Sequence, residues 1–132
     1  MKVVLDTNIF ISSFYWPGNP RKVFDRITNG IDELYIIDEI LNEIVSVMIR
    51  SKFNTNDDKI KEYVKIIESY SIKLSSKKIS EDVSRDKDDN KIIQCGLDGD
   101  VDYIITGDKD LLILKEHKKI KIVNPKEYLG MV

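Results

Sequence analysis

Val3-Val4-Leu5-Asp6-Thr7-Asn8 opens the chain as a short apolar run that ends on an acid, and Tyr103-Ile104-Ile105-Thr106-Gly107-Asp108-Lys109-Asp110 repeats the pattern near the other end. Short, fully apolar runs rich in β-branched residues are typical of buried strands in a parallel sheet. In open α/β sheets, the binding crevice lies outside the carboxyl ends of the strands. We therefore expect the acids of both runs to meet at one edge of a sheet.

A third acidic segment, Asp86-Lys87-Asp88-Asp89-Asn90, opens an apolar stretch with helical character. Two like charges about 5 Å apart repel by roughly 3 kcal/mol at an effective dielectric near 20. A hard divalent cation among the oxygens offsets that repulsion. Each acid also has a structural explanation, because Asp6 can start a turn that Thr7 and Asn8 continue, and the other acids can favour helix starts. The pattern alone leaves both interpretations open.

The remaining periodicity predicts alternating strands and helices. Strands are expected at about 2–6, 34–37, 72–74, 103–106 and 120–123, the last ended by Pro125. Helices are expected between Pro20 and Gly30, over about 39–50 and 56–70, from Asp88 or Asp89 onward, and over 111–114. Thr55 with Asp58 resembles a capping box for the third of these segments. Alternation of this kind predicts one parallel sheet with helices on both faces.

Length and composition predict one domain spanning residues 1–132. Of the 132 residues, 33% are charged and 42% hydrophobic, and the net charge of −2 gives no electrostatic case for a general nucleic-acid binder. A single Cys and a single His argue against a disulfide framework and a structural zinc site. The chain also has no apolar run long enough to cross a bilayer and no room for a signal peptide before the first strand. We expect a cytoplasmic protein.

Glu43 is a fourth acid of interest. It falls at the border of the apolar stripe of the helix predicted over 39–50, where it can face the crevice or be an ordinary solvated acid.

Four segments in order resemble the motifs of PIN domains. They are Val3 to Ile11, Ile40-Leu41-Asn42-Glu43-Ile44 followed by Arg50-Ser51-Lys52-Phe53, Asp88-Asp89-Asn90-Lys91, and Tyr103 to Leu112. Together they span almost the whole chain. Within that superfamily the chain looks most like the VapC-type PIN toxins of prokaryotic toxin–antitoxin systems.

The resemblance implies a three-layer α/β/α sandwich with a mainly parallel sheet of four or five strands. It also implies a ribonuclease that depends on Mg²⁺ or Mn²⁺. The acidic positions that it carries over are Asp6, Glu43, Asp89 and Asp108, with Asp110 as a further metal ligand and with Asn8 and Thr106 as residues that organise the carboxylates. Whether Asp88 or Asp89 faces the metal stays open.

Flanking cations are candidate contacts for the RNA backbone: Arg85, Lys87, Lys91 and Lys109. Lys87 departs from the family, which often has proline there. The resemblance implies a homodimer and an antitoxin partner, and the aromatic segment of Phe10, Phe14, Tyr15 and Trp16 adds some support for the dimer. We expect the dimer contact to include part of that segment or the helix predicted over about 56–70. Two other functions stay open: a PIN-like module that binds RNA or a partner without cutting, and a Mg²⁺-dependent phospho-receiver.

Overall fold

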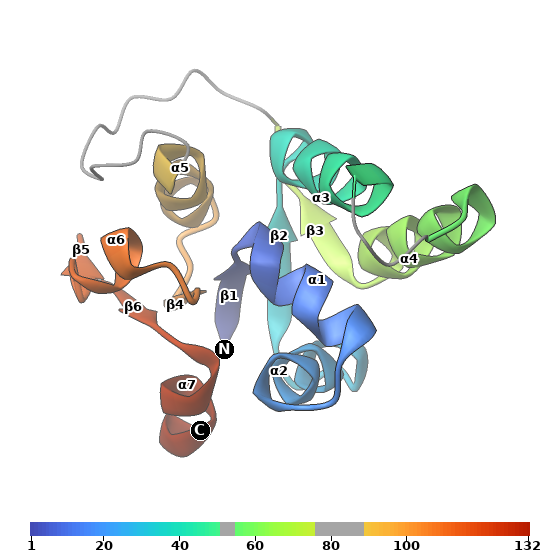
Figure 1. Ribbon diagram of the computed structural model, residues 1–132. Helices are drawn as coiled ribbons and strands as arrows, with labels where there is room; N and C mark the ends of the chain where they lie inside the picture. Colours follow the sequence, from blue (N-terminus) through green and yellow to red (C-terminus); the bar gives the residue numbers. More distant parts are fainter. Residues whose placement is uncertain (51–54, 76–88) are drawn as a thin grey trace.

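The computed structural model describes residues 1–50, 55–75 and 89–132 and is built around one twisted sheet (Figure 1). The strand order is β3-β2-β1-β4-β6-β5. The strands are β1 (Lys2–Leu5), β2 (Glu33–Ile36), β3 (Ser71–Lys73), β4 (Tyr103–Ile105), β5 (Glu116–His117) and β6 (Ile120–Val123). All neighbouring strands are parallel except β5 and β6. The mainly parallel sheet is confirmed. Within the described residues the sheet has six strands, one more than the upper limit of the four or five predicted, because two-residue β5 is too short to show a periodic pattern.

Helices cover the sheet: α1 (Thr7–Tyr15), α2 (Asn19–Thr28), α3 (Asp38–Arg50), α4 (Asp57–Ser69), α5 (Asn90–Asp98), α6 (Lys109–Leu112) and α7 (Pro125–Met131). In Figure 1, α1 to α4 lie to one side of β1, and α5 and α6 lie to the other. The strand order agrees with this separation, because β2 and β3 lie on one side of β1 in the sheet whereas β4, β6 and β5 lie on the other. The predicted α/β class with helices flanking a central sheet is confirmed. Of the helices described, none is long and apolar enough to cross a membrane.

Helix α1 was not expected from the sequence. The interpretation of Thr7 and Asn8 as the continuation of a turn is wrong, because both belong to the first turn of α1. The helix is rich in β-branched and aromatic residues, which have modest helix propensity. Five of its nine residues are buried, so tertiary packing decides its conformation.

Two helix starts also differ from the sequence-based expectation. Pro125 does not merely end the last strand but is the first residue of α7, whose Asn124 and Glu127 form a reciprocal capping box. At the start of α4 the cap is Asn56, whose side chain accepts a hydrogen bond from the Lys59 N–H at 2.8 Å. The Thr55 hydroxyl instead pairs with the hydroxyl of Tyr15.

The aromatic segment near the end of β1 packs mainly within the protein. Phe14 stacks on Tyr63 of α4 with ring centroids 4.1 Å apart, and it meets Phe24 of α2 edge-on. Phe10 is fully buried, whereas Trp16 remains 48% exposed. Only the end of this segment is therefore available to a partner.

A buried carboxylate links three parts of the fold. The Asp32 side chain is 1% exposed and accepts hydrogen bonds from Arg26 of α2 at 2.8 Å, from the Tyr128 hydroxyl of α7 at 2.7 Å, and from the N-terminal ammonium at 3.2 Å. Burial disfavours the charged form of Asp32, but these hydrogen bonds outweigh that cost and its pKa is lowered. Asp32 therefore links α2 to α7 through hydrogen bonds to a side chain of each helix.

Replacing Asp32 should produce a pH-dependent loss of stability. A lowered pKa in the folded state contributes stability that is fully present above the unfolded-state pKa of about 3.9 and is lost as the pH falls through the folded-state pKa. We expect Asp32→Asn to lower the free energy of unfolding by about 3 kcal/mol at pH 7. The difference from wild type should shrink toward pH 3. Urea denaturation at both pH values measures it, with exposed Asp25→Asn as the matched control. Equal losses in the two variants would contradict this role.

Candidate functional site

The register of β1 against β4 places the first acid of the site. Leu5 pairs with Ile105, and the Asp6 N–H donates a hydrogen bond to the Ile105 carbonyl at 3.1 Å. Asp6 and Thr106 therefore lie beside each other at the carboxyl ends of two central strands, although 100 residues separate them in sequence. Both side chains belong to buried residues.

Thr106 connects Asp6 to the acids of the following loop. Its hydroxyl donates to Asp6 Oδ2 at 2.8 Å and accepts a hydrogen bond from the Asp108 N–H at 3.0 Å. Asp108 Oδ1 then accepts from the Asp110 N–H at 2.7 Å and caps α6. The expectation that Asp108 caps the following helix is thus confirmed. Its other carboxylate oxygen is not used by this cap.

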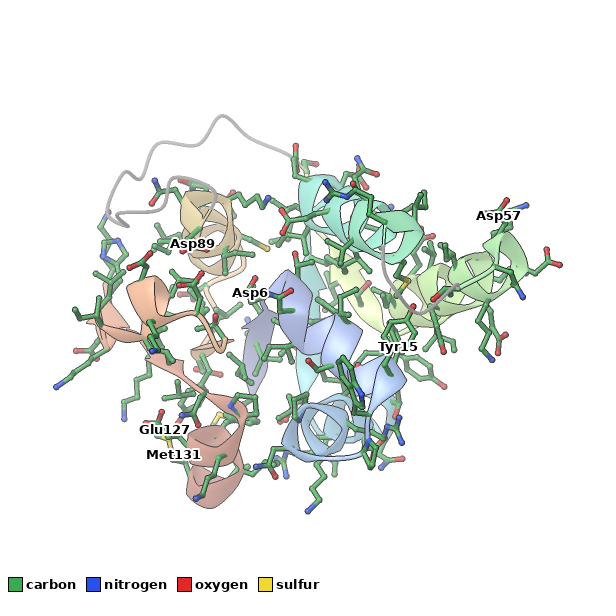
Figure 2. The ribbon with its side chains drawn as sticks, viewed as in Figure 1. Asp6, Tyr15, Asp57, Asp89, Glu127 and Met131 are labelled. Atoms are coloured by element: carbon green, nitrogen blue, oxygen red, sulfur yellow. The ribbon has the colours of Figure 1, made fainter. Side chains whose placement is uncertain are left out.

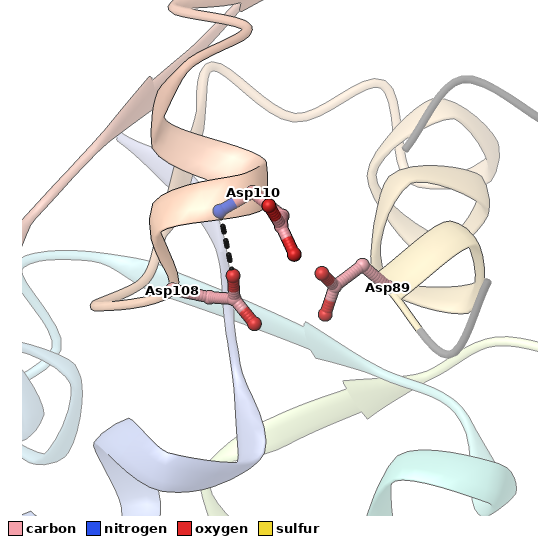
Figure 3. Close-up of side chains that lie close together, drawn as sticks. All are labelled: Asp89, Asp108 and Asp110. Atoms are coloured by element: carbon pink, nitrogen blue, oxygen red, sulfur yellow. Dashed lines mark hydrogen bonds between the residues drawn. The ribbon is translucent and has the colours of Figure 1, made fainter. Parts of the chain in front are cut away.

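Three acids converge at the same edge. Asp89, at the start of α5, and Asp108 and Asp110, around the start of α6, point their carboxylates toward one another (Figure 3), and one oxygen of each lies within 4.8 Å of the others. Asp89 is buried, whereas Asp108 and Asp110 are half-buried. Helix α5 lies close to the sheet at Gly96, where an added Cβ would lie 3.1 Å from Ile104 Cδ1. This close packing fixes the depth at which Asp89 enters the site.

The acids near Asp6 affect its pKa. Its pKa is raised, first by burial and further by the negative charges of Asp108 and Glu43. Hydrogen bonds from Thr106 and from the Thr7 backbone lower the pKa but do not cancel those effects. A bound cation would favour the charged form of Asp6. Figure 2 shows Asp6 and Asp89 near the same edge, with Asp57 at the far tip of α4.

Glu43 lies on α3, outside the three-acid group. Its side chain is 35% exposed, and its carboxylate pairs with the Lys91 ammonium of α5. The pair spans the gap between α3 and α5. Glu43 is thus near enough to affect the pKa of Asp6, but its charge is partly neutralised by Lys91.

The other predicted site residues are more scattered. Asn8 is exposed on α1, and Lys109 is exposed at the start of α6. Arg85 and Lys87 lie outside the described residues, as does Asp88.

A groove of about 440 Å³ has one of the three clustered acids, Asp108, in its lining. Asp108 and Asn8 line it together with Asn19, Asn124 and Lys126, from the starts of α2 and α7. The sequence-based site did not include these last three residues. A signal was present, since the dipeptide Asn-Pro occurs twice, at residues 19–20 and 124–125, and both pairs border this groove. A groove of about 630 Å³ lined by residues of α3 and α4 contains none of the predicted site residues.

The donor set fits a hard divalent cation. Every candidate ligand is a carboxylate oxygen, which suits Mg²⁺ or Mn²⁺ better than zinc. The buried Thr7 hydroxyl, next to Asp6 in the chain, has no hydrogen-bond partner among the described residues. Acids drawn this close, with Asp6 raised in pKa, are the arrangement that a bound cation stabilises.

Comparison with known proteins identifies relatives. A family model described as the PIN domain matches residues 2–110. An uncharacterized protein of the archaeon Methanocaldococcus jannaschii is 34% identical over an alignment that covers 98% of this chain and 90% of the relative.

Thr106 provides a test of how the site is held together. Thr106→Val keeps the shape of the side chain but removes the hydroxyl that bonds both the Asp6 carboxylate and the Asp108 N–H. The Asp6 carboxylate keeps its hydrogen bond from the Thr7 backbone. We expect it to lower the free energy of unfolding by about 1–3 kcal/mol. Thr106→Ser retains the hydroxyl and should lose much less. Chemical denaturation at pH 7 compares the two, and equal losses would show that the hydroxyl contributes no more to stability than the methyl group that Thr106→Ser removes.

Proposed function

The chain belongs to the PIN domain family, and we propose that it is a ribonuclease that hydrolyses RNA phosphodiester bonds with Mg²⁺ or Mn²⁺. Membership of this family indicates a metal-dependent nuclease. The observation that carries the proposal is the group of Asp89, Asp108 and Asp110, whose oxygens lie within 4.8 Å of one another at the edge where Asp6 follows β1. The family assignment leaves no support for the phospho-receiver alternative.

Under this proposal, most of the acids would bind the metal ion directly, and Glu43 would not. Asp6, Asp89 and Asp108 would hold the ion, with Asp110 as an additional ligand and Thr106 orienting Asp6. Such an ion supplies an activated water and stabilises the oxygen that leaves. Glu43 would act at the margin of the site, where Lys91 limits its charge. Asn8 would position the carboxylates or substrate from α1.

RNA is the proposed substrate despite the net charge of −2. A metal held by the acids would contact the scissile phosphate, so a broadly basic surface is not required. Of the cations proposed from the sequence, Lys109 is exposed between Asp108 and Asp110 and would contact the RNA backbone there. Lys91 is committed to Glu43, and it would reach RNA only by leaving that pair.

Asp6→Asn should abolish metal-dependent cleavage of RNA. The change removes the charge of a buried ligand but keeps the shape of the side chain, so the fold should survive. Gel analysis of a labelled single-stranded RNA, with Mg²⁺ and Mn²⁺ compared against EDTA, measures the loss. Asp57→Asn, an exposed acid at the start of α4, is the charge-matched control and should cleave like wild type. Full activity in well-folded Asp6→Asn would falsify the assignment of this residue.

Metal binding has a second readout that does not depend on cleavage. An ion that binds only the folded state adds about 2.7 kcal/mol at a hundredfold excess over its dissociation constant. The melting temperature of wild type should therefore rise with millimolar Mg²⁺ or Mn²⁺, and that of Asp6→Asn should rise less. A metal-induced rise without any RNA cleavage would instead favour the alternative of a PIN-like module that binds without cutting.

We further propose that the protein is the toxin of a cytoplasmic toxin–antitoxin pair and forms a homodimer. Trp16, 48% exposed at the end of α1, supplies apolar area beside a packed aromatic group. An antitoxin would most simply act by placing an Arg or Lys among the acids.

Trp16→Ala should weaken the dimer, because aromatic side chains are enriched in interface cores. Light scattering at micromolar concentration should give a dimer for wild type and a lower average mass for the variant. Exposed Tyr70→Ala is the control at a different surface. A monomeric wild type would contradict the dimer proposal. A dimer that Trp16→Ala does not weaken would show that the interface lies at another surface.

A further inference from the structure

The groove that leads away from Asp108 has the features of a substrate site. Its walls come from α1, α2, the loop after β4 and the start of α7, and its volume of about 440 Å³ lies within the range of pockets that bind small ligands. Asp108 lines the groove and also belongs to the three-acid group. A ligand in the groove would therefore reach the candidate metal site through Asp108.

The polar side chains of the groove are available to a ligand. Those of Asn8, Ser12 and Asn19 make no hydrogen bond within the part of the chain that the structure describes, and Asn124 uses its side-chain oxygen to cap α7, which leaves its amide donors. Amide and hydroxyl groups match the hydrogen-bonding edges of bases and the ribose hydroxyl. Pro20 adds an apolar surface between them.

The groove carries charges of both signs. Its acid is Asp108, which belongs to the three-acid group, and its cation is the exposed Lys126, at the start of α7. Among the described residues Lys126 has no salt bridge. A polyanionic strand fits this arrangement, with one phosphate at the metal and a neighbouring phosphate near Lys126.

The groove is also preformed. Arg26 and Tyr128, on the two helices that contribute Asn19 and Lys126, are both hydrogen-bonded to buried Asp32. Helices α2 and α7 therefore keep their relative position without a ligand. A rigid site of this kind avoids much of the ordering cost of binding.

From these observations, and on the premise of the proposed ribonuclease function, we propose that this groove binds the nucleotide next to the scissile phosphate of single-stranded RNA. Asn19 and Asn124 contact its base or ribose, and Lys126 contacts its phosphate. The groove thereby contributes to the choice of cleavage site.

Binding of an eight-nucleotide fluorescent single-stranded RNA, measured by anisotropy in the Asp6→Asn background with Mg²⁺, tests this site without cleavage. Lys126→Gln should weaken binding and reduce the slope of log affinity against log salt by about 0.7, the value for one phosphate contact on a single strand. Lys61→Gln, an exposed lysine on α4, is the matched control and should leave the slope unchanged. Asn19→Trp, which fills the groove, should lower the affinity about tenfold or more, with the fold checked by circular dichroism.

The outcomes separate this proposal from the ribonuclease function. An unchanged salt slope in Lys126→Gln would overturn the proposal that the groove binds RNA, even if wild type cleaves RNA. Undiminished RNA affinity in folded Asn19→Trp would overturn it as well. If the variants behave as expected but wild type cuts no RNA with either metal, the groove stands as an RNA site and the catalytic function fails.

Discussion

The pairing of β1 with β4 is the constraint on which the site depends. Leu5 and Ile105 are partners in the parallel ladder. One residue further on, the Asp6 carboxylate accepts a hydrogen bond from the Thr106 hydroxyl. A slip of one residue in this register would turn each side chain to the opposite face. The apolar residues of both strands are buried and hold the pair in the core. The observed register thus brings Asp6 and Thr106 together at the carboxyl ends of the two strands.

Sequence periodicity was sufficient where one pattern dominated. The strands that begin at Lys2 and Tyr103 and the amphipathic helices α3 and α4 are found where expected, within a few residues. It was insufficient where packing overrode local preference, as in α1, whose residues favour strands in isolation. The start of α7 is a different case, because Asn124, Pro125 and Glu127 carry a clear helix-start signal that was interpreted only as the end of a strand.

The same distinction applies to the site. Acids that follow strands or open helices, such as Asp6, Asp89 and Asp108, could be placed at one edge because topology alone sends strand ends there. Contacts between side chains of two different helices depend on how closely the helices pack. Hydrophobic periodicity in the sequence does not predict that distance. The pairing of Glu43 with Lys91 is of this kind, and so is the groove, which forms only when α2 and α7 meet over Asp32.

The two outermost strands of the sheet have a consequence for how molecules can associate. Exposed edges invite pairing with another chain, and short, charged edge strands discourage it. Here β3 has three residues and ends on exposed Lys73, whereas β5 has two residues and is followed by Lys118 and Lys119. Neither edge offers a long, apolar template for continuing the sheet into a neighbour. The two described edge strands therefore disfavour edge-to-edge aggregation between copies of this protein.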